Sequence, residues 1–193
     1  GNLGMAYADL GDARRALEYC ERQLVVFREI ADRRGEGHAL CNLGTAYTHL
    51  SDVQRAIDYY EQALKIAREV EDRQGQGSAL CNLGQAYHEL GETRRAIDYH
   101  EQYLAIVRET GDRKGQGRAL ANLGGTYHQL GEERRAIEYY QQALVILREI
   151  EDVDGVATVA FNMALLYAQQ GDAAHALAMA REGAQVIATD LNP

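Results

Sequence analysis

A short motif recurs along this chain every 40 residues. Residues 41–47 read Cys-Asn-Leu-Gly-Thr-Ala-Tyr, and residues 81–87 differ from them at a single position. Two further copies begin at residues 1 and 121, and a degraded copy begins at residue 161. Self-similarity at a fixed period of about 20 to 50 residues is typical of repeat arrays, whose length counts their units. We therefore expect one domain that covers residues 1–193.

Each repeat carries two stripes of apolar residues at the three- and four-residue steps of an amphipathic helix. In residues 72–109 the first stripe is Ala79, Leu80, Leu83, Ala86, Tyr87 and Leu90, and the second is Ala96, Ile97, Tyr99, His100, Leu104 and Val107. A glycine–acid pair such as Gly91-Glu92 separates the stripes, and an aspartate suited to an N-cap precedes each first helix. These aspartates are Asp32, Asp72, Asp112 and Asp152. The pattern predicts antiparallel helices of about 17 residues each.

The expected repeat units are about residues 1–31, 32–71, 72–111, 112–151 and 152–193. The last unit has an alanine, Ala164, where the other copies have glycine, and its second helix is rich in alanine. Terminal repeats are usually atypical because one of their faces lacks a neighbour. We interpret this unit as a capping or transitional repeat.

Glycines lie in the middle of the first helix of four units, although glycine costs about 0.8 to 1 kcal/mol there relative to alanine. They are Gly4, Gly44, Gly84 and Gly124. We expect close approach of two helix backbones at these points, with small residues of the second helix facing them. Those residues are Ala16, Ala56, Ala96, Ala136 and Ala176. Tyrosines that follow the apolar stripes, such as Tyr47 and Tyr59, are interpreted as packing rings.

Composition limits the class of partner. A formal net charge of −9 argues against general affinity for nucleic acid or for an anionic membrane, since both need clustered positive charge. The chain has no run of 18 apolar residues and no signal-type amino terminus. It begins inside a repeat without methionine, so we expect it to be a piece of a longer protein.

Cysteine usage indicates a reducing compartment. Of the three cysteines, Cys41 and Cys81 occupy equivalent positions of neighbouring repeats. Such positions lie about 10 Å or more apart, beyond the roughly 7 Å Cα separation that a disulfide tolerates. We therefore expect reduced thiols and a cytoplasmic location.

The repeated motif of this chain resembles the tetratricopeptide repeat. Its pattern of large residue, Leu, Gly, Tyr, Ala, aromatic and Ala is matched by Leu40, Leu43, Gly44, Tyr47, Ala56, Tyr60 and Ala63. The 40-residue period is similar to a longer variant found in Pins-type G-protein signalling modulators and in bacterial regulators. The resemblance covers the whole chain and implies an all-α solenoid of about five helix pairs in a right-handed superhelix. It also implies that the first helix of each pair lines a concave groove.

The groove positions of that family hold polar residues with little charge. The residues expected to bind a peptide are Asn42, Asn82, Asn122, Gln85, His88, His128, Arg118, His38, Arg34 and Lys114. A ladder of asparagines offers donors and acceptors to the main chain of an extended peptide. The alternative is that these asparagines bond only to backbone carbonyls of the adjacent repeat. Arg34, Lys114 and Arg118 form either a basic region for acidic side chains or a set of solvated helix-end charges.

Catalytic and metal-binding interpretations find little support. The segments Gly35-Glu36-Gly37, Gly75-Gln76-Gly77 and Gly115-Gln116-Gly117 lack the preceding strand and the following Lys-Ser/Thr of a phosphate loop. His49, His88 and His128 have no supporting cluster of cysteines or carboxylates. We expect no enzyme activity, no metal and no cofactor. The expected function is a scaffold that binds a peptide or partner segment, and the alternative is a ligand-sensing or autoinhibitory module of a larger signalling protein, ATPase or transcription regulator.

Overall fold

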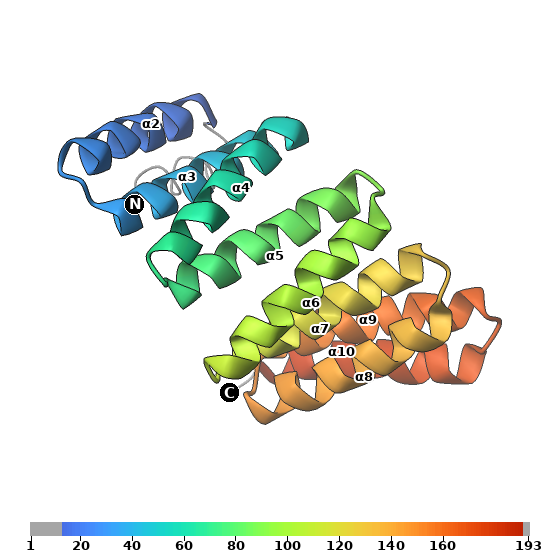
Figure 1. Ribbon diagram of the computed structural model, residues 1–193. Helices are drawn as coiled ribbons and strands as arrows, with labels where there is room; N and C mark the ends of the chain where they lie inside the picture. Colours follow the sequence, from blue (N-terminus) through green and yellow to red (C-terminus); the bar gives the residue numbers. More distant parts are fainter. Residues whose placement is uncertain (1–12, 191–193) are drawn as a thin grey trace. The chain divides into compact units, whose positions relative to one another are not determined.

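The computed structural model describes residues 13–190, with side chains over residues 14–186. Within this range the chain forms nine α-helices and no strand (Figure 1). They are α2 (Ala13–Glu29), α3 (Arg33–His49), α4 (Val53–Glu69), α5 (Arg73–Glu89), α6 (Thr93–Glu109), α7 (Arg113–Gln129), α8 (Glu133–Glu149), α9 (Val153–Gln169) and α10 (Ala173–Asp190). We call α3, α5, α7 and α9 helices A, and the others helices B. The predicted helix type and the predicted length of about 17 residues are confirmed.

Aspartates and left-handed residues set the helix ends, as the sequence predicts. Asp32, Asp72, Asp112 and Asp152 each accept a hydrogen bond from the backbone N–H three residues later, which is a glycine. This contact satisfies one of the free amides at a helix N-terminus. Between the helices of a pair, the backbone turns at Gly91 with φ +73° and at Gly131 with φ +80°. Glycine adopts this conformation without a steric penalty. The predicted turn at Gly11-Asp12 lies outside the described residues.

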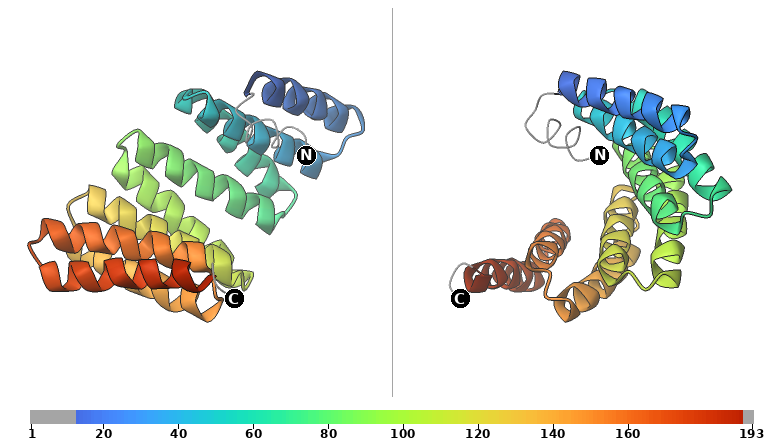
Figure 2. Two further views of the ribbon diagram at one scale, coloured as in Figure 1. Left: turned by 180° about the vertical axis from the view of Figure 1, so that it is seen from behind. Right: turned by 90° about the vertical axis from the view of Figure 1, so that its left-hand side faces the viewer.

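The chain divides into two compact units, Gly1–Ile106 and Val107–Pro193. In the first unit, α3 packs against α2, α4 and α5, and α4 also packs against α5. In the second unit, α7 packs against α8 and α9, and α9 packs against α8 and α10 (Figure 2). Each unit therefore brings two helices A into contact. The single array over residues 1–193 stays a prediction.

Aromatic rings fill the space between the helices of a pair. Tyr47 stacks on Tyr59 with ring centroids 5.3 Å apart, and Tyr127 stacks on Tyr139 at 5.2 Å. Tyr87 and Tyr99 repeat the arrangement at 5.3 Å. The interpretation of these tyrosines as packing rings is confirmed. Offset aromatic pairs of this kind contribute about 0.5–1.5 kcal/mol beyond their burial.

Aromatic rings of helices B reach the mid-helix glycines of helices A. A Cβ at Gly44 would lie 2.5 Å from Tyr60 Cε1, and one at Gly124 would lie 2.6 Å from Tyr140 Cδ1. The ring one turn after the alanine therefore reaches the glycine, while Ala56 is fully buried and its predicted contact with the glycine stays a prediction. Residues four apart share a helix face, so the sequence pattern does not distinguish them. The expected close approach of the two backbones stays a prediction, and Gly4 lies outside the described residues.

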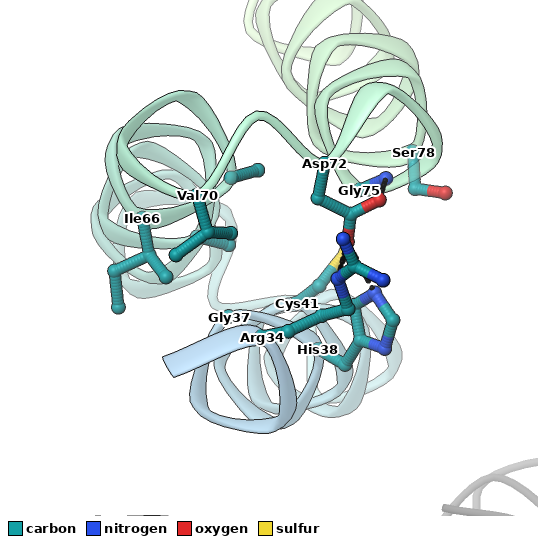
Figure 3. A pocket seen from close by; sticks show the side chains of 11 residues that line it. Arg34, Gly37, His38, Cys41, Ile66, Val70, Asp72, Gly75 and Ser78 are labelled. Carbon is teal, nitrogen blue, oxygen red and sulfur yellow. Dashed lines mark hydrogen bonds and ion pairs between the residues drawn. The ribbon is translucent and has the colours of Figure 1, made fainter. Parts of the chain in front are cut away.

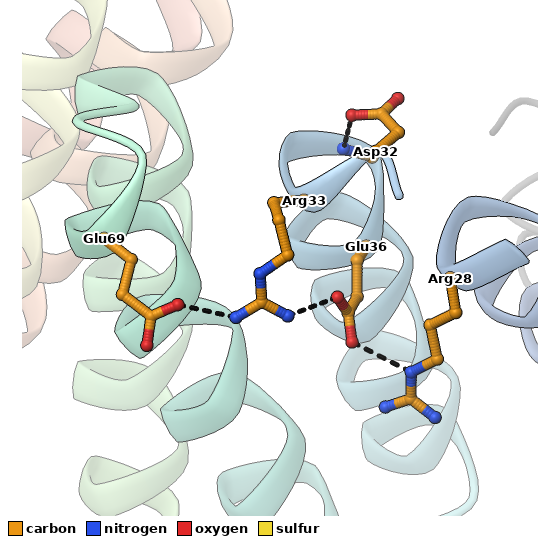
Figure 4. Close-up of polar contacts among 6 residues, drawn as sticks. Arg28, Asp32, Arg33, Glu36 and Glu69 are labelled. Carbon is orange, nitrogen blue, oxygen red and sulfur yellow. Dashed lines mark hydrogen bonds and ion pairs between the residues drawn. The ribbon is translucent and has the colours of Figure 1, made fainter. Parts of the chain in front are cut away.

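A chain of ion pairs joins the first three described helices (Figure 4). Arg28 Nε of α2 donates to Glu36 Oε1 of α3 at 2.8 Å. Arg33 bridges Glu36 and Glu69, the second of which belongs to α4 and lies 2.5 Å from Arg33 Nη2. The hydrogen bond from Arg28 is the main reason why the pKa of Glu36 is lowered. The network therefore links α2, α3 and α4, although its half-exposed arginines limit its contribution to stability.

Candidate functional site

The ten predicted site residues lie on helices A. Helix α3 carries Arg34, His38 and Asn42, helix α5 carries Asn82, Gln85 and His88, and helix α7 carries Lys114, Arg118, Asn122 and His128. The three asparagines and both histidines at positions 88 and 128 are half-buried, and the others are exposed. Helices α3 and α5 belong to the first unit and α7 to the second, so the two groups are described in turn.

Asp72 is the focus of polar contacts in the first unit. This aspartate precedes α5, is only 8% exposed, and accepts a hydrogen bond from Gly75 N–H at 3.1 Å. His38 Nε2 donates to its Oδ2 at 2.9 Å, and Arg34 Nε lies 3.7 Å from the same oxygen. Both side chains come from α3 and point toward Asp72 (Figure 3). One carboxylate thus caps its own helix and holds two predicted site residues of the preceding repeat.

The environment of Asp72 favours its charged form. Burial by itself raises the pKa of this carboxyl, but the Gly75 amide, the hydrogen bond from His38 and the charge of Arg34 together lower it below its usual value. Beside the cluster, Cys41 and Ser78 help to line a cavity of about 20 Å³. That volume is on the order of one water molecule. The cavity is therefore too small for a ligand side chain, and the exposed residues around it form the accessible part of the site.

Asn82 makes a contact that the sequence does not predict. Its Nδ2 donates to Cys41 Sγ of the preceding repeat at 3.4 Å. The predicted alternative, a bond to a backbone carbonyl, therefore does not describe Asn82. Sulfur is a weak acceptor, so this bond holds the amide loosely. Among the residues the structure describes, no donor bonds to Asn82 Oδ1.

The Cys41 thiol at this contact is a poor nucleophile. Cys20, Cys41 and Cys81 are free thiols, as predicted. Burial raises the pKa of Cys41 to about 11, although the hydrogen bond from Asn82 acts in the opposite direction. A thiol with a raised pKa stays protonated at neutral pH and reacts slowly. Cys41 therefore contributes packing and a weak hydrogen-bond acceptor rather than chemistry.

A histidine takes the place of a tyrosine beneath Gln85 and His88. In the preceding repeat, Tyr60 Oη lies 3.3 Å from Thr45 Oγ1 and 3.2 Å from Thr48 Oγ1, so that its hydroxyl reaches the helix A surface. The equivalent residue, His100, is 2% exposed, and its Nδ1 has no hydrogen-bond partner in the described part of the chain. Burial and the nearby His88 lower the pKa of His100 to about 4. The ring is therefore neutral under physiological conditions.

In the second unit the predicted basic residues differ in their surroundings. Lys114 Nζ lies 3.4 Å from Asp152 Oδ2, which repeats the relation between Arg34 and Asp72. Arg118 is exposed, and its guanidinium forms no ion pair with another residue in the range 14–186. His128 is half-buried with its Nδ1 unpaired in the described residues. Of these three, Arg118 presents its charge most openly to a partner.

Helices B carry two hollows that sequence reasoning missed. One of about 530 Å³ lies between α4 and α6 and is lined by Glu61, Leu64, Arg68, Tyr87, Arg95, Asp98, Tyr99 and Gln102. The other, of about 370 Å³, is lined by the equivalents one repeat earlier, including Leu24, Arg28, Arg55, Asp58, Tyr59 and Gln62. Arg95 lies over the Tyr87 ring at 5.2 Å, and Arg55 lies over Tyr47 at 5.5 Å. The sequence signal for these two hollows is the repeated spacing of a tyrosine and an arginine, as in Tyr47 and Arg55.

Metal binding and membrane insertion place geometric demands that can be compared with the described residues. No group of three or more His, Cys, Asp or Glu side chains in this range is arranged to hold a metal ion. None of the helices found there combines the length and apolar character required to cross a bilayer. The three Gly-X-Gly segments lie in the first turns of α3, α5 and α7, where they are helical.

Comparison with known proteins gives both a family and similar structures. A family model described as tetratricopeptide repeat matches residues 1–69, 39–109, 77–149 and 115–186. Among curated proteins no match is found. The crystal structure of aspartyl phosphate phosphatase F from Bacillus subtilis aligns with a TM-score of 0.88 at 16% identity, over 98% of this chain and 50% of that one.

Two further solved structures have the same fold. A Rap protein complexed with competence and sporulation factor aligns with a TM-score of 0.83 at 18% identity, over 96% of this chain and 52% of that one. A signal transduction ATPase with numerous domains and a tetratricopeptide repeat sensor, from Pyrococcus horikoshii, has a TM-score of 0.73 at 20% identity, over 95% and 32%. This chain spans about half, or less, of the length of these proteins. Because the family model matches nearly its whole length, the chain belongs to the tetratricopeptide repeat family.

Proposed function

We propose that this chain is a scaffold that binds a segment of a partner protein along the exposed face of its helices A. Tetratricopeptide repeats typically serve as non-catalytic modules for protein interaction. The helix A face is defined by the groove positions of each repeat: His38, Asn42, Thr45, Thr48 and His49 on α3, and Ser78, Asn82, Gln85, His88 and Glu89 on α5.

The observation that carries the proposal is the state of the asparagines on α3 and α5. These helices pack together, and Asn42 and Asn82 occupy equivalent, half-buried positions on them. Asparagine is a poor helix former, and Asn82 is held only by the weak bond to Cys41 among the described residues. Its amide therefore has an acceptor oxygen available, and it can exchange a weak donor bond for a stronger one to a peptide carbonyl. This pattern supports main-chain recognition of an extended segment.

An acidic residue of the partner is proposed to contact Arg118. Arg34 and Lys114 each lie near an N-cap aspartate, Asp72 and Asp152 respectively, which offsets part of their charge. Arg118 is exposed without such a recorded partner in the described residues. An exposed ion pair is worth under about 1 kcal/mol. Arg118 therefore adjusts the preference of the second unit for acidic ligands.

A second candidate is a ligand-sensing module within a larger signalling protein. The similar ATPase from Pyrococcus horikoshii contains a tetratricopeptide repeat sensor, and this chain corresponds to 32% of that protein. The similar Rap protein was crystallised with competence and sporulation factor. As a scaffold or as a sensor, the chain would bind its ligand on the helix A face. The sequence of the full-length protein separates them, because a nucleotide-binding or DNA-binding domain beside the repeats favours the sensor.

A peptide-array screen of the chain followed by hydrogen–deuterium exchange tests the proposed face. The tightest peptide should slow amide exchange in α3 and α5, because bound peptide covers these helices and stabilises their backbone hydrogen bonds. Exchange in the exposed turns of α4 and α6 serves as the internal reference. Protection limited to α4 and α6 would place the partner in the hollows of helices B and overturn the proposal.

A further inference from the structure

The two hollows of helices B repeat one set of side chains, and both lie in the first unit. Each is lined by a leucine, two arginines, an aspartate, a tyrosine and a glutamine. In the α2–α4 hollow these are Leu24, Arg28, Arg55, Asp58, Tyr59 and Gln62, and in the α4–α6 hollow they are Leu64, Arg68, Arg95, Asp98, Tyr99 and Gln102. Their volumes of about 370 and 530 Å³ fall in the range of about 300–1,000 Å³ that is usual for ligand sites. The α4–α6 hollow lies well inside the chain, with further described helices before α4 and after α6.

Three of the four arginines in the hollows already pair with carboxylates that do not line them. These pairs are Arg28–Glu36 at 2.8 Å, Arg55–Asp52 at 3.2 Å and Arg95–Glu92 at 3.1 Å. The fourth arginine, Arg68, donates to the neutral side chain of Gln102 at 3.0 Å. Most of the positive charge at the hollows is therefore offset from outside.

The aspartates of the hollows are not offset in this way. Asp58 and Asp98 are exposed, and neither carboxylate forms an ion pair or a hydrogen bond within the part of the chain that the structure describes. Glu61 adds a second carboxylate to the α4–α6 hollow, where its Oε1 accepts a hydrogen bond from Tyr87 Oη at 3.3 Å. Arg68 balances one of these two negative charges. Each hollow thus keeps one uncompensated carboxylate beside a tyrosine.

A guanidinium group matches this combination of carboxylate and aromatic ring. It can donate two parallel hydrogen bonds to a carboxylate, and its planar face packs against tyrosine. The chain itself contains this arrangement: Arg95 pairs with Glu92, and its Cζ lies 5.2 Å from the centroid of the Tyr87 ring. An acidic side chain would instead be repelled by Asp58 or Asp98. The net charge of −9 also attracts a basic partner over longer distances.

We infer that Asp58 and Asp98 mark a second interaction surface, on which the two hollows each bind an arginine side chain of a basic segment of a partner protein. This surface lies on helices B, so it does not depend on the proposed function of the helix A face. Equivalent positions of neighbouring repeats lie about 10 Å or more apart. An extended chain advances about 3.3 Å per residue, so two arginines that are about three to five residues apart can enter both hollows.

The test uses the full chain and a fluorescein-labelled peptide of alanine and glutamine that carries two arginines about four residues apart. Two further peptides carry citrulline, which is uncharged, or lysine in place of arginine. Asp58→Asn with Asp98→Asn is compared with Glu71→Gln with Glu151→Gln, which removes the same charge from exposed positions outside the hollows. All four residues are exposed, so the melting temperature should not change. Fluorescence anisotropy at low ionic strength, where charge pairs are least screened, gives the affinities.

The arginine peptide should bind the parent chain and the glutamate variant equally, and the aspartate variant about tenfold more weakly. The citrulline and lysine peptides should bind the parent chain more weakly than the arginine peptide. If the arginine peptide does not bind the parent chain, or if the two variants lose affinity equally, the hollows are not an arginine site. Equal binding of the lysine peptide would also overturn the assignment to arginine.

The variant Asn42→Ala with Asn82→Ala separates this inference from the proposed function. It alters only the helix A face, so it should bind the arginine peptide as tightly as the parent chain does. A loss of affinity in this variant, with none in the aspartate variant, would place the arginine peptide on the helix A face and overturn the inference.

Discussion

The imidazole of His100 lies against the Cα of Gly84, where any side chain at position 84 would have to be. A Cβ built there would lie 2.9 Å from His100 Cγ and closer still to Cε1 and Nδ1. Tyr60 and Tyr140 take the same position against Gly44 and Gly124. Each of these repeats thus has a glycine on helix A where a ring of helix B packs. In one repeat this ring is the imidazole of His100 instead of a tyrosine phenol.

Gly84→Ala should therefore destabilise the fold, because the buried His100 ring has no room to move away. Overpacking of this kind costs about 1–3 kcal/mol. Gly125→Ala is the matched control, since a Cβ there meets only Tyr140 Oη at 3.4 Å. This control should gain up to about 1 kcal/mol from helix propensity. Urea denaturation of the two variants tests the contrast, and equal changes of the same sign would refute it.

His100 should make the fold sensitive to acid. Burial lowers its pKa from 6.5 to about 4, so the unfolded chain binds the proton more tightly than the folded chain. The contribution of neutral His100 to the free energy of unfolding is fully present above pH 6.5, and it declines as the pH falls toward 4. The loss is on the order of 3 kcal/mol.

His100→Tyr restores the residue type of Tyr60 and Tyr140 and should reduce this sensitivity. The measurement is the free energy of unfolding between pH 7 and pH 4.5 for parent and variant. An identical decline in both proteins would show that other groups dominate acid unfolding.

Asp72→Ala should destabilise more than Asp32→Ala. Both aspartates cap a helix A by accepting a glycine N–H, at 3.1 Å for Asp72 and 2.9 Å for Asp32. Loss of a cap alone costs about 1 kcal/mol. Asp72 also accepts from His38 at 2.9 Å and is only 8% exposed, so its removal loses a second, partly buried hydrogen bond as well as the cap. Melting temperatures compare the two variants, and a larger effect for Asp32→Ala would contradict the role assigned to Asp72.

Glu36→Gln should be well tolerated, because glutamine already occupies this position in two other repeats. Gln76 Nε2 donates to Ala67 O at 3.1 Å, and Gln116 Nε2 donates to Val107 O at 3.1 Å. The pKa of Glu36 is lowered, chiefly by Arg28, so its contribution is present above pH 4.5 and lost as the pH falls through the folded value. The variant should lack this part of the acid response. Glu36→Ala removes both the acceptor and the donor at this position, so it should destabilise more than Glu36→Gln. If both variants are equally mild in urea denaturation, the hydrogen bonds of the side chain at position 36 do not stabilise the fold.

Local features of the sequence predicted the helices well. Asp72 at an N-cap and Gly91 after a helix determine the ends of their helices through contacts within four residues, so the pattern alone defines them. Contacts between repeats were not predictable in the same way. Arg34 and His38 reach Asp72 across more than 30 residues, and Asn82 reaches Cys41 across 41. These depend on the distance between packed helices, which hydrophobic periodicity does not specify.

Exposure also distinguishes residues that the pattern treats alike. Phe161 stands where Cys41 and Cys81 stand, yet Phe161 is 61% exposed and Cys81 only 5% exposed, and the helical periodicity is the same in all three repeats. Ala56 and Tyr60 likewise share one helix face, and the periodicity does not show that the Tyr60 ring is what reaches Gly44.

The most direct test of the central claim is calorimetric titration of the array-selected peptide against Asn42→Ala with Asn82→Ala. Each net hydrogen bond to a neutral group contributes about 0.5–1.5 kcal/mol, so losing the amides on two helices should weaken binding by about tenfold or more. Gln62→Ala, which removes an exposed amide from α4, is the matched control and should leave affinity unchanged. Melting temperatures within a few degrees of the parent confirm that both variants are folded. A peptide that binds the asparagine variant as tightly as the parent chain would show that the partner does not use the face of helices α3 and α5.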